Sequence, residues 1–146
     1  MFGHVENREI ILNEFWERVR FTWIDLMKHN TNIELDKFIV MPNHVHGIIE
    51  IVGAPLVGAH PNHRAGTRPA PTLGDIVGAF KSITTNEYIR NVKTNGWAPF
   101  RTRLWQRNYY DRVIRTETEL NKTREYIEYN PKNWADDEYN ILGFEQ

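Results

Sequence analysis

Two histidines that lie two residues apart, His44 and His46, are the side chains of this chain best suited to metal chemistry. Successive side chains of a strand point to opposite faces, so residues two apart share a face. Apolar runs at 38–40 and 48–51 predict strands on both sides of the pair. Both imidazoles would then project together and could bind one divalent ion, with a further ligand from elsewhere. The alternative is a pair of histidines on a solvated strand face.

Tyr126 and Asn130, four residues apart near the C-terminus, could complete such a site. Thr116 and Glu119 form the start of a predicted helix, which Pro131 ends near Asn130. The four-residue spacing places Tyr126 and Asn130 on one helical face. A tyrosine hydroxyl can attack a phosphodiester, and an asparagine carbonyl oxygen suits Mg²⁺ or Mn²⁺. The alternative is that Tyr126 is a core aromatic residue and Asn130 a helix-end residue.

Residues 101–115 form a basic segment, with five arginines against one acidic residue, although the whole chain has a net charge of -1. Arginines neutralise phosphates and aromatic rings stack on bases, so this composition is typical of a platform for single-stranded DNA. The candidate residues are Arg101, Arg103, Trp105, Arg107, Tyr109, Tyr110, Arg112 and Arg115. The alternative is a set of scattered surface arginines held in ion pairs.

Two further helices are predicted by caps and apolar spacing. Asn13 is a suitable N-cap, and apolar residues at spacings of three and four after it predict a helix of about 15 residues that ends near residue 29. Thr72 and Asp75 resemble a capping box, and they open a second amphipathic helix that should end near Arg90. These helices are expected to cover the strands that carry the histidines.

Strands and loops complete the pattern. A polar turn within residues 2–12 predicts a short hairpin, and Met41-Pro42-Asn43 should join the two strands around the histidines. The predicted strands lie at 33–40, 44–52, 100–105 and 109–114. The Gly-, Ala- and Pro-rich residues 53–71 predict a long loop whose polar side chains could add DNA contacts, namely His60, His63, Arg64 and Arg68. The tail 132–146 should pack across the domain.

The composition bounds the class of protein. With 146 residues, 40% hydrophobic and 25% charged, residues 1–146 form one globular domain. The absence of cysteine excludes disulfides and thiolate sites. No apolar run approaches the roughly 20 residues of a membrane span, and the N-terminus does not resemble a signal peptide, so we expect a cytoplasmic protein without membrane partners. Helices flanking an antiparallel sheet predict an α+β fold.

Two motifs in the right order resemble a known family, over nearly the whole chain. Phe-Ile-Val-Met-Pro-Asn-His-Val-His-Gly-Ile-Ile at 38–49 resembles the His-hydrophobic-His (HUH) motif of single-tyrosine transposases. Leu-Trp-Gln-Arg-Asn-Tyr-Tyr-Asp-Arg-Val-Ile-Arg at 104–115, followed by Tyr-Ile-Glu-Tyr-Asn-Pro at 126–131, resembles the signature of the branch associated with repetitive extragenic palindromes. The resemblance implies a ferredoxin-like domain that cuts single-stranded DNA at or near hairpins.

Carried onto this sequence, the resemblance implies a role for each candidate residue. His44, His46 and Asn130 would bind Mg²⁺ or Mn²⁺, with Asn130 standing where the insertion-sequence branch more often has Gln. Tyr126 would be the nucleophile that keeps a 5′-phosphotyrosine and frees a 3′-hydroxyl. Tyr129 is expected to be structural or to stack on DNA. The readings left open are a hairpin-binding protein without catalysis and, less favoured, a metallohydrolase without covalent chemistry.

One departure from the family concerns the start of the chain. Family members usually have an aromatic-rich strand before the position of Phe2, and that strand is central in the sheet. We therefore expect a truncated first strand, whose place is taken by residues 2–12 or by a neighbouring chain in a homodimer.

Overall fold

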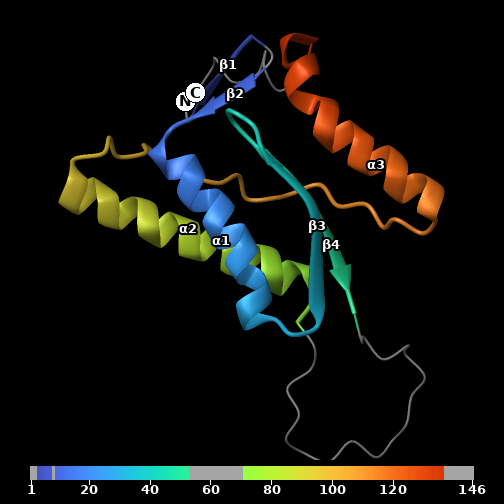
Figure 1. The fold of residues 1–146 in the computed structure, drawn as a ribbon. Coiled ribbons are helices and arrows are strands. Elements are labelled where there is room, and N and C mark those ends of the chain that lie inside the picture. The colour runs from blue at the N-terminus through green and yellow to red at the C-terminus, as the bar shows by residue number, and fades with distance from the viewer. Residues whose placement is uncertain (1–2, 8, 53–70, 137–146) are drawn as a thin grey trace, which may run out of the picture.

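The computed structural model describes residues 3–7, 9–52 and 71–136, which form two β-hairpins and three α-helices (Figure 1). The elements are β1 (Gly3–Glu6), β2 (Glu9–Leu12), α1 (Glu14–His29), β3 (Ile33–Val40), β4 (Val45–Ile51), α2 (Leu73–Asn95), α3 (Glu117–Tyr129) and the 3-10 helix η1 (Asn130–Asp136). The predicted α+β class is confirmed. The loop candidates His60, His63, Arg64 and Arg68 and the tail residues 137–146 lie outside the described residues.

The β3–β4 hairpin lies between helices on its two faces. Helix α1 packs on β3 from one side and α2 packs on α1, whereas α3 packs on β3 from the other side (Figure 1). The strands are antiparallel, with Ile39 opposite His46, and a bulge interrupts the register between Leu35 and Phe38. Because the bulge adds one residue to the alternation, Ile33 and Leu35 before it and Phe38 after it all contact the same core.

That core lies between β3–β4 and the two N-terminal helices. Helix α1 contributes Trp16, which is 1% exposed, and Trp23, which stacks on Phe38 with ring centroids 4.3 Å apart. The stacking leaves no room beside Gly47 of β4, because a Cβ atom there would lie 2.5 Å from the Trp23 ring. The glycine between His46 and Ile48 is therefore required by the packing of α1 against the strand.

The helix predictions hold, with one boundary corrected. Asn13 accepts from the backbone N–H of Trp16 and begins α1, as predicted, and the capping box of Thr72 and Asp75 is fully formed at the start of α2. Helix α2 continues to Asn95, beyond the predicted end near Arg90. It ends at Gly96, whose φ of 70° lies in the left-handed region that glycine adopts readily.

The strands predicted at 100–105 and 109–114 are wrong, since the structure gives this segment no ladder pairing. The segment is instead held by side chains of α2. The indole N–H of Trp105 donates to Thr84 Oγ1 over 2.9 Å, and Lys81 Nζ donates to the carbonyl oxygen of Gln106 over 2.9 Å. Trp105 also packs edge-on against Trp16. Arginines and rings predicted to project from strands therefore project from an irregular chain.

The N-terminal hairpin forms its own two-stranded sheet. Strand β1 pairs only with β2 and β3 only with β4 among the described strands, and Asn7 turns the hairpin with a φ of 51°. The expectation that residues 2–12 fill a place in the sheet of the histidines is therefore wrong. A ferredoxin-like order is consistent with these elements and stays a prediction, as does the homodimer. None of the described helices has the length and apolar character that crossing a bilayer requires.

Candidate functional site

The two histidines share one face of the β3–β4 hairpin, as their spacing predicts. Met41 and Pro42 are fully buried at the hairpin turn, and the backbone N–H of Met41 donates to the carbonyl oxygen of His44 over 2.8 Å. The Nε2 atoms of His44 and His46 lie 2.9 Å apart, and their rings meet edge to face at 84°. The buried turn thus fixes the strand start so that both Nε2 atoms converge on one point.

Asn43 orients the first of these rings. Its Oδ1 lies 2.7 Å from Nδ1 of His44, which fits an Nδ1–H donor and leaves Nε2 as the unprotonated nitrogen. A hydrogen bond from the second ring nitrogen to an oxygen is the usual support of a metal-binding histidine. Sequence reasoning assigned Asn43 only to the turn. Its position directly before His44 was the signal that would have indicated this second role.

Tyr126 of α3 lies beside the histidine pair. Its ring centroid is 5.4 Å from that of His46, with the ring planes at 79°. The side chain is 56% exposed and lines a groove of about 420 Å³ together with Arg112, Glu119, Lys122 and Thr123. The neighbouring candidate Tyr129 is also exposed, and Lys132 Nζ lies 4.7 Å from the centre of its ring. Of these two tyrosines, Tyr126 is the one whose ring contacts a histidine ring among the described residues.

Asn130 is the buried polar residue at the end of α3. It is 3% exposed, follows Tyr126 by one helical turn, and begins η1 rather than ending all helical structure, because Pro131 is tolerated in a first helical turn. Within the described residues, its Oδ1 is buried and has no hydrogen-bond partner. Such an acceptor costs about 1–3 kcal/mol when unsatisfied. A cation ligated by this oxygen would remove that cost.

Trp134 of η1 is a second residue that sequence reasoning did not assign to the site. Its ring centroid lies 6.0 Å from that of His44. The described residues contain no group of three His, Cys, Asp or Glu side chains placed so that they could hold one metal ion. The polar groups present at this place are the Nε2 atoms of His44 and His46, 2.9 Å apart, and the buried amide oxygen of Asn130 at the end of α3.

Ion pairs with the bulge of β3 hold α3 in place. Arg124 Nε lies 2.7 Å from Asp36 Oδ2, and Lys37 Nζ lies 3.0 Å from Glu128 Oε2. Among the residues described for α3, Ile127 is the only buried apolar one, so apolar packing contributes little to holding this helix. Asp36 and Lys37 are the two residues at the bulge, between Leu35 and Phe38. The bulge therefore keeps the apolar residues of β3 on one face and places these two charged side chains where they contact α3.

The N-terminus of α3 is capped in a modified way. Thr116 Oγ1 accepts from the backbone N–H of Glu119, as predicted, and the Glu119 carboxylate accepts from the backbone N–H of Arg115 over 3.0 Å. This hydrogen bond from Arg115 is the main cause that lowers the pKa of Glu119, and Arg112 at 3.2 Å adds to it. Arg112 is thereby held in the groove of Tyr126.

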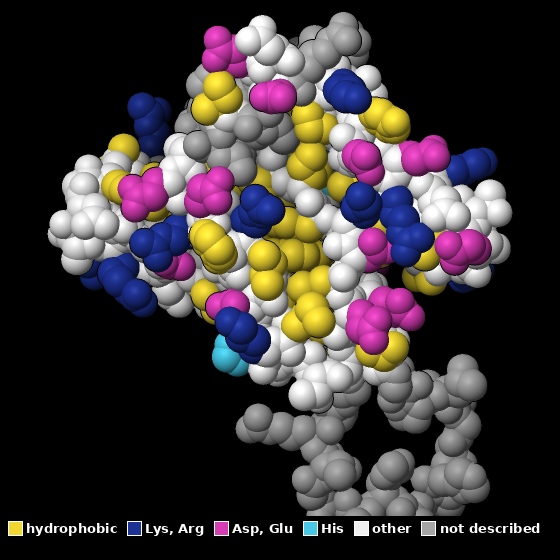
Figure 2. All heavy atoms as spheres, viewed as in Figure 1, with side chains coloured by type: hydrophobic (Ala, Val, Ile, Leu, Met, Phe, Trp, Pro, Cys, Tyr) yellow, Lys and Arg dark blue, Asp and Glu magenta, His cyan; other side chains and the backbone are white. Residues whose placement is uncertain are grey.

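The predicted basic platform is divided between two places. Arg103, Trp105 and Arg107 line a pocket against α2, whereas Arg112 lines the groove of Tyr126. Trp105 is half-buried and bonded to the core, so it anchors the segment. Among the other candidates, Arg101 and Arg115 are exposed, and Tyr110 is 94% exposed. The Nζ atom of Lys81 lies 5.6 Å from the ring centre of Tyr109. Figure 2 shows basic and acidic side chains interspersed on the face in view, around an apolar area.

Comparison with known proteins gives one informative relationship. An uncharacterized protein of Haemophilus influenzae is 34% identical in an alignment that covers 94% of this chain and 76% of that protein. The chain belongs to the family of that protein. No protein-family model matches the chain. No solved structure matches it either.

Proposed function

We propose that this protein is a metal-dependent endonuclease and strand transferase of the HUH single-tyrosine type, which acts in the cytoplasm on single-stranded or hairpin DNA. The observation that carries the proposal is the exposed Tyr126 ring against His46, with the Nε2 atoms of His44 and His46 2.9 Å apart. The buried Oδ1 of Asn130, without a hydrogen-bond partner in the described chain, lies one helical turn from Tyr126.

His44, His46 and Asn130 would hold the ion. The Nε2 atoms of His44 and His46 lie 2.9 Å apart, so both imidazoles could bind the same ion. Asn43 supports the tautomer in which Nε2 of His44 accepts. When bound, Mg²⁺ or Mn²⁺ supplies Lewis acidity to a phosphoryl oxygen.

Tyr126 would carry the covalent step. Its hydroxyl oxygen forms a bond to the phosphorus of a phosphodiester while the bond from phosphorus to the 3′-oxygen breaks. The phenolic proton passes to water, and the 3′-oxygen leaves as a hydroxyl after taking up a proton. The product is a 5′-phosphotyrosine and a free 3′-hydroxyl, whose attack on the same phosphorus in reverse, or that of another 3′-hydroxyl, rejoins a strand.

The groove of Tyr126 suits the charge of such a substrate. Arg112 and Lys122 line it together with the single carboxylate of Glu119, which Arg112 already neutralises. Tyr110 exposes nearly its whole ring to solvent, two residues before Arg112. A cationic groove beside an exposed ring is the usual arrangement for binding an unpaired strand.

The test is a covalent-adduct assay. The purified chain is incubated with a labelled DNA hairpin that carries single-stranded flanks, with Mn²⁺ or with EDTA, and is then separated under denaturing conditions. We expect labelled protein only with Mn²⁺. A hairpin that binds in a native gel but gives no adduct in either condition would favour the non-catalytic hairpin-binding protein. Cleaved DNA without labelled protein would favour the metallohydrolase.

A further inference from the structure

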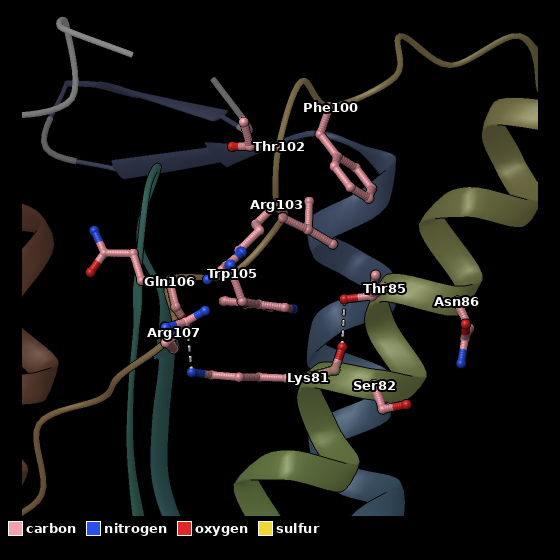
Figure 3. Close-up of a pocket in the computed structure, with 11 residues that line it drawn as sticks. Lys81, Ser82, Thr85, Asn86, Phe100, Thr102, Arg103, Trp105, Gln106 and Arg107 are labelled. Carbon is pink, nitrogen blue, oxygen red and sulfur yellow. Dashed lines mark hydrogen bonds between the residues drawn. The ribbon is translucent and has the colours of Figure 1, made fainter.

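A second cationic pocket is lined by residues of α2 and of the segment that follows it, and by no residue of β3, β4 or α3. It has a volume of about 440 Å³ and is formed between one stripe of α2 and residues 100–107 (Figure 3). Lys81, Ser82, Thr85 and Asn86 form the wall on α2. None of the side chains of the proposed catalytic site lines this pocket.

The pocket is built for an anion. Lys81, Arg103 and Arg107 contribute three cationic groups, and no Asp or Glu is among the lining residues. Neither arginine makes an ion pair with a carboxylate of the described residues, in contrast to Arg112 and Arg124. In Figure 3 the ends of Arg103, Arg107 and Lys81 gather on one side of the pocket.

The walls of the pocket are fixed before any ligand arrives. Lys81 Nζ donates to the carbonyl oxygens of Gln106 and Asn108, which ties the segment to α2. Partial burial lowers the pKa of this lysine, in keeping with a position inside the structure rather than on a solvated surface. Trp105 is locked by its bond to Thr84. Arg103 and Arg107, which have no carboxylate partner among the described residues, are therefore carried by a segment that is bound to α2 at residues 105, 106 and 108.

The same segment leads from this pocket to Tyr126. Arg107 lines the first pocket and Arg112 lines the groove, and the chain between them carries the exposed ring of Tyr110. Five residues span at most about 18 Å, so the two cationic places are close enough for one strand of a few nucleotides to reach both.

From this geometry we infer that the pocket of Arg103 and Arg107 binds a backbone phosphate of the same single strand whose scissile phosphate lies at Tyr126. The inference rests on the proposed function for the second of these contacts. The bound DNA strand would then run along residues 103–112, and its affinity would depend on its length. A mononucleotide reaches one place only, whereas a longer strand reaches both and binds more tightly.

The experiment measures binding without cleavage. A fluorescent oligothymidylate of about fifteen nucleotides is titrated with the protein in EDTA at several salt concentrations. The double variant R103Q/R107Q should bind about tenfold more weakly, and its log–log salt slope should be smaller by about 0.7, the value for one lost phosphate contact on a single strand. The matched control R20Q/R90Q removes two exposed arginines of α1 and α2 that line neither pocket and should change affinity little.

The possible outcomes separate the inference from the proposed function. An unchanged slope in R103Q/R107Q, or equal losses in the two double variants, overturns the inference. Tight binding of thymidine monophosphate that is lost in R103Q/R107Q would assign the pocket to a free nucleotide and would also overturn it. Because no metal and no adduct are needed, a negative covalent-adduct assay leaves a positive binding result standing, and thermal melts of each variant check its fold.

Discussion

The two faces of the β3–β4 hairpin differ in the side chains that they carry and in the contacts that these make. The face toward α1 carries close-packed apolar rings, with Trp23 stacked on Phe38 and no space for a Cβ at Gly47. The face toward α3 carries His46 against Tyr126 and is held by ion pairs of Asp36 and Lys37. Stability therefore resides mainly on the first face, and the polar groups suited to chemistry are placed on the second.

The largest expected effect tests the polar face alone. Tyr126→Phe removes the proposed nucleophile and keeps the ring that contacts His46, so the covalent adduct should disappear while DNA binding and melting temperature stay nearly unchanged. Denaturing gels with labelled hairpin DNA measure the adduct. Tyr129→Phe is the matched control and should retain it. The opposite result, loss of the adduct in Tyr129→Phe only, would show that Tyr129 and not Tyr126 is the nucleophile.

Metal binding should connect the polar face to stability. At a Mn²⁺ concentration about 100 times the dissociation constant, the free energy of unfolding should rise by about 2.7 kcal/mol. His46→Ala and Asn130→Ala should each lose most of this increase, which differential scanning fluorimetry with and without Mn²⁺ reports.

The control for this experiment is His29→Ala at the exposed end of α1. It should keep the full Mn²⁺ effect. A Mn²⁺ effect that is equal in wild type, His46→Ala and Asn130→Ala would place the ion elsewhere.

A substitution on the apolar face should act on stability first. Gly47→Ala places a methyl group 2.5 Å from the Trp23 ring, and such overpacking costs about 1–3 kcal/mol. Urea denaturation measures the loss. Gly78→Ala is the control, because nothing lies within 4 Å of the added Cβ and alanine favours a helix interior, so it should be neutral or slightly stabilising. Equal stability of the two variants would contradict the packing that we describe.

The smallest effect concerns the start of α3. The folded-state pKa of Glu119 is lowered below its ordinary 4.5, mainly by the backbone N–H of Arg115. Its ionised form therefore stabilises the fold at neutral pH, and this contribution is lost as pH falls through the folded-state pKa. Glu119→Gln should melt slightly below wild type at pH 7, and the difference should shrink below pH 4.5. A constant difference across this range would show that the charge does not matter.

Local patterns were enough to predict most elements. The N-caps Asn13, Thr72 and Thr116 depend on neighbouring residues only, so α1, α2 and α3 were expected at the right places. The shared face of His44 and His46 follows in the same way from the two-residue period of a strand. The end of α2 was missed because Gly96, rather than the loss of apolar spacing near Arg90, ends the helix.

Tertiary structure decided what sequence spacing could not. Residues 100–114 have strand-like composition, but Trp105 and Lys81 bind them to α2 by side chains, so no ladder forms. The β1–β2 hairpin forms as its turn predicts, but it does not join the β3–β4 sheet, because pairing between distant strands is not fixed by local sequence. The position of Tyr126 beside His46 depends on the packing of α3 against the β3–β4 hairpin, which spacing along the chain does not give. The sequence by itself therefore determined where the helices and the histidine strands form, through N-caps and the periodicity of apolar residues. The tertiary structure decided which side chains contact one another, because burial and strand pairing depend on the whole chain.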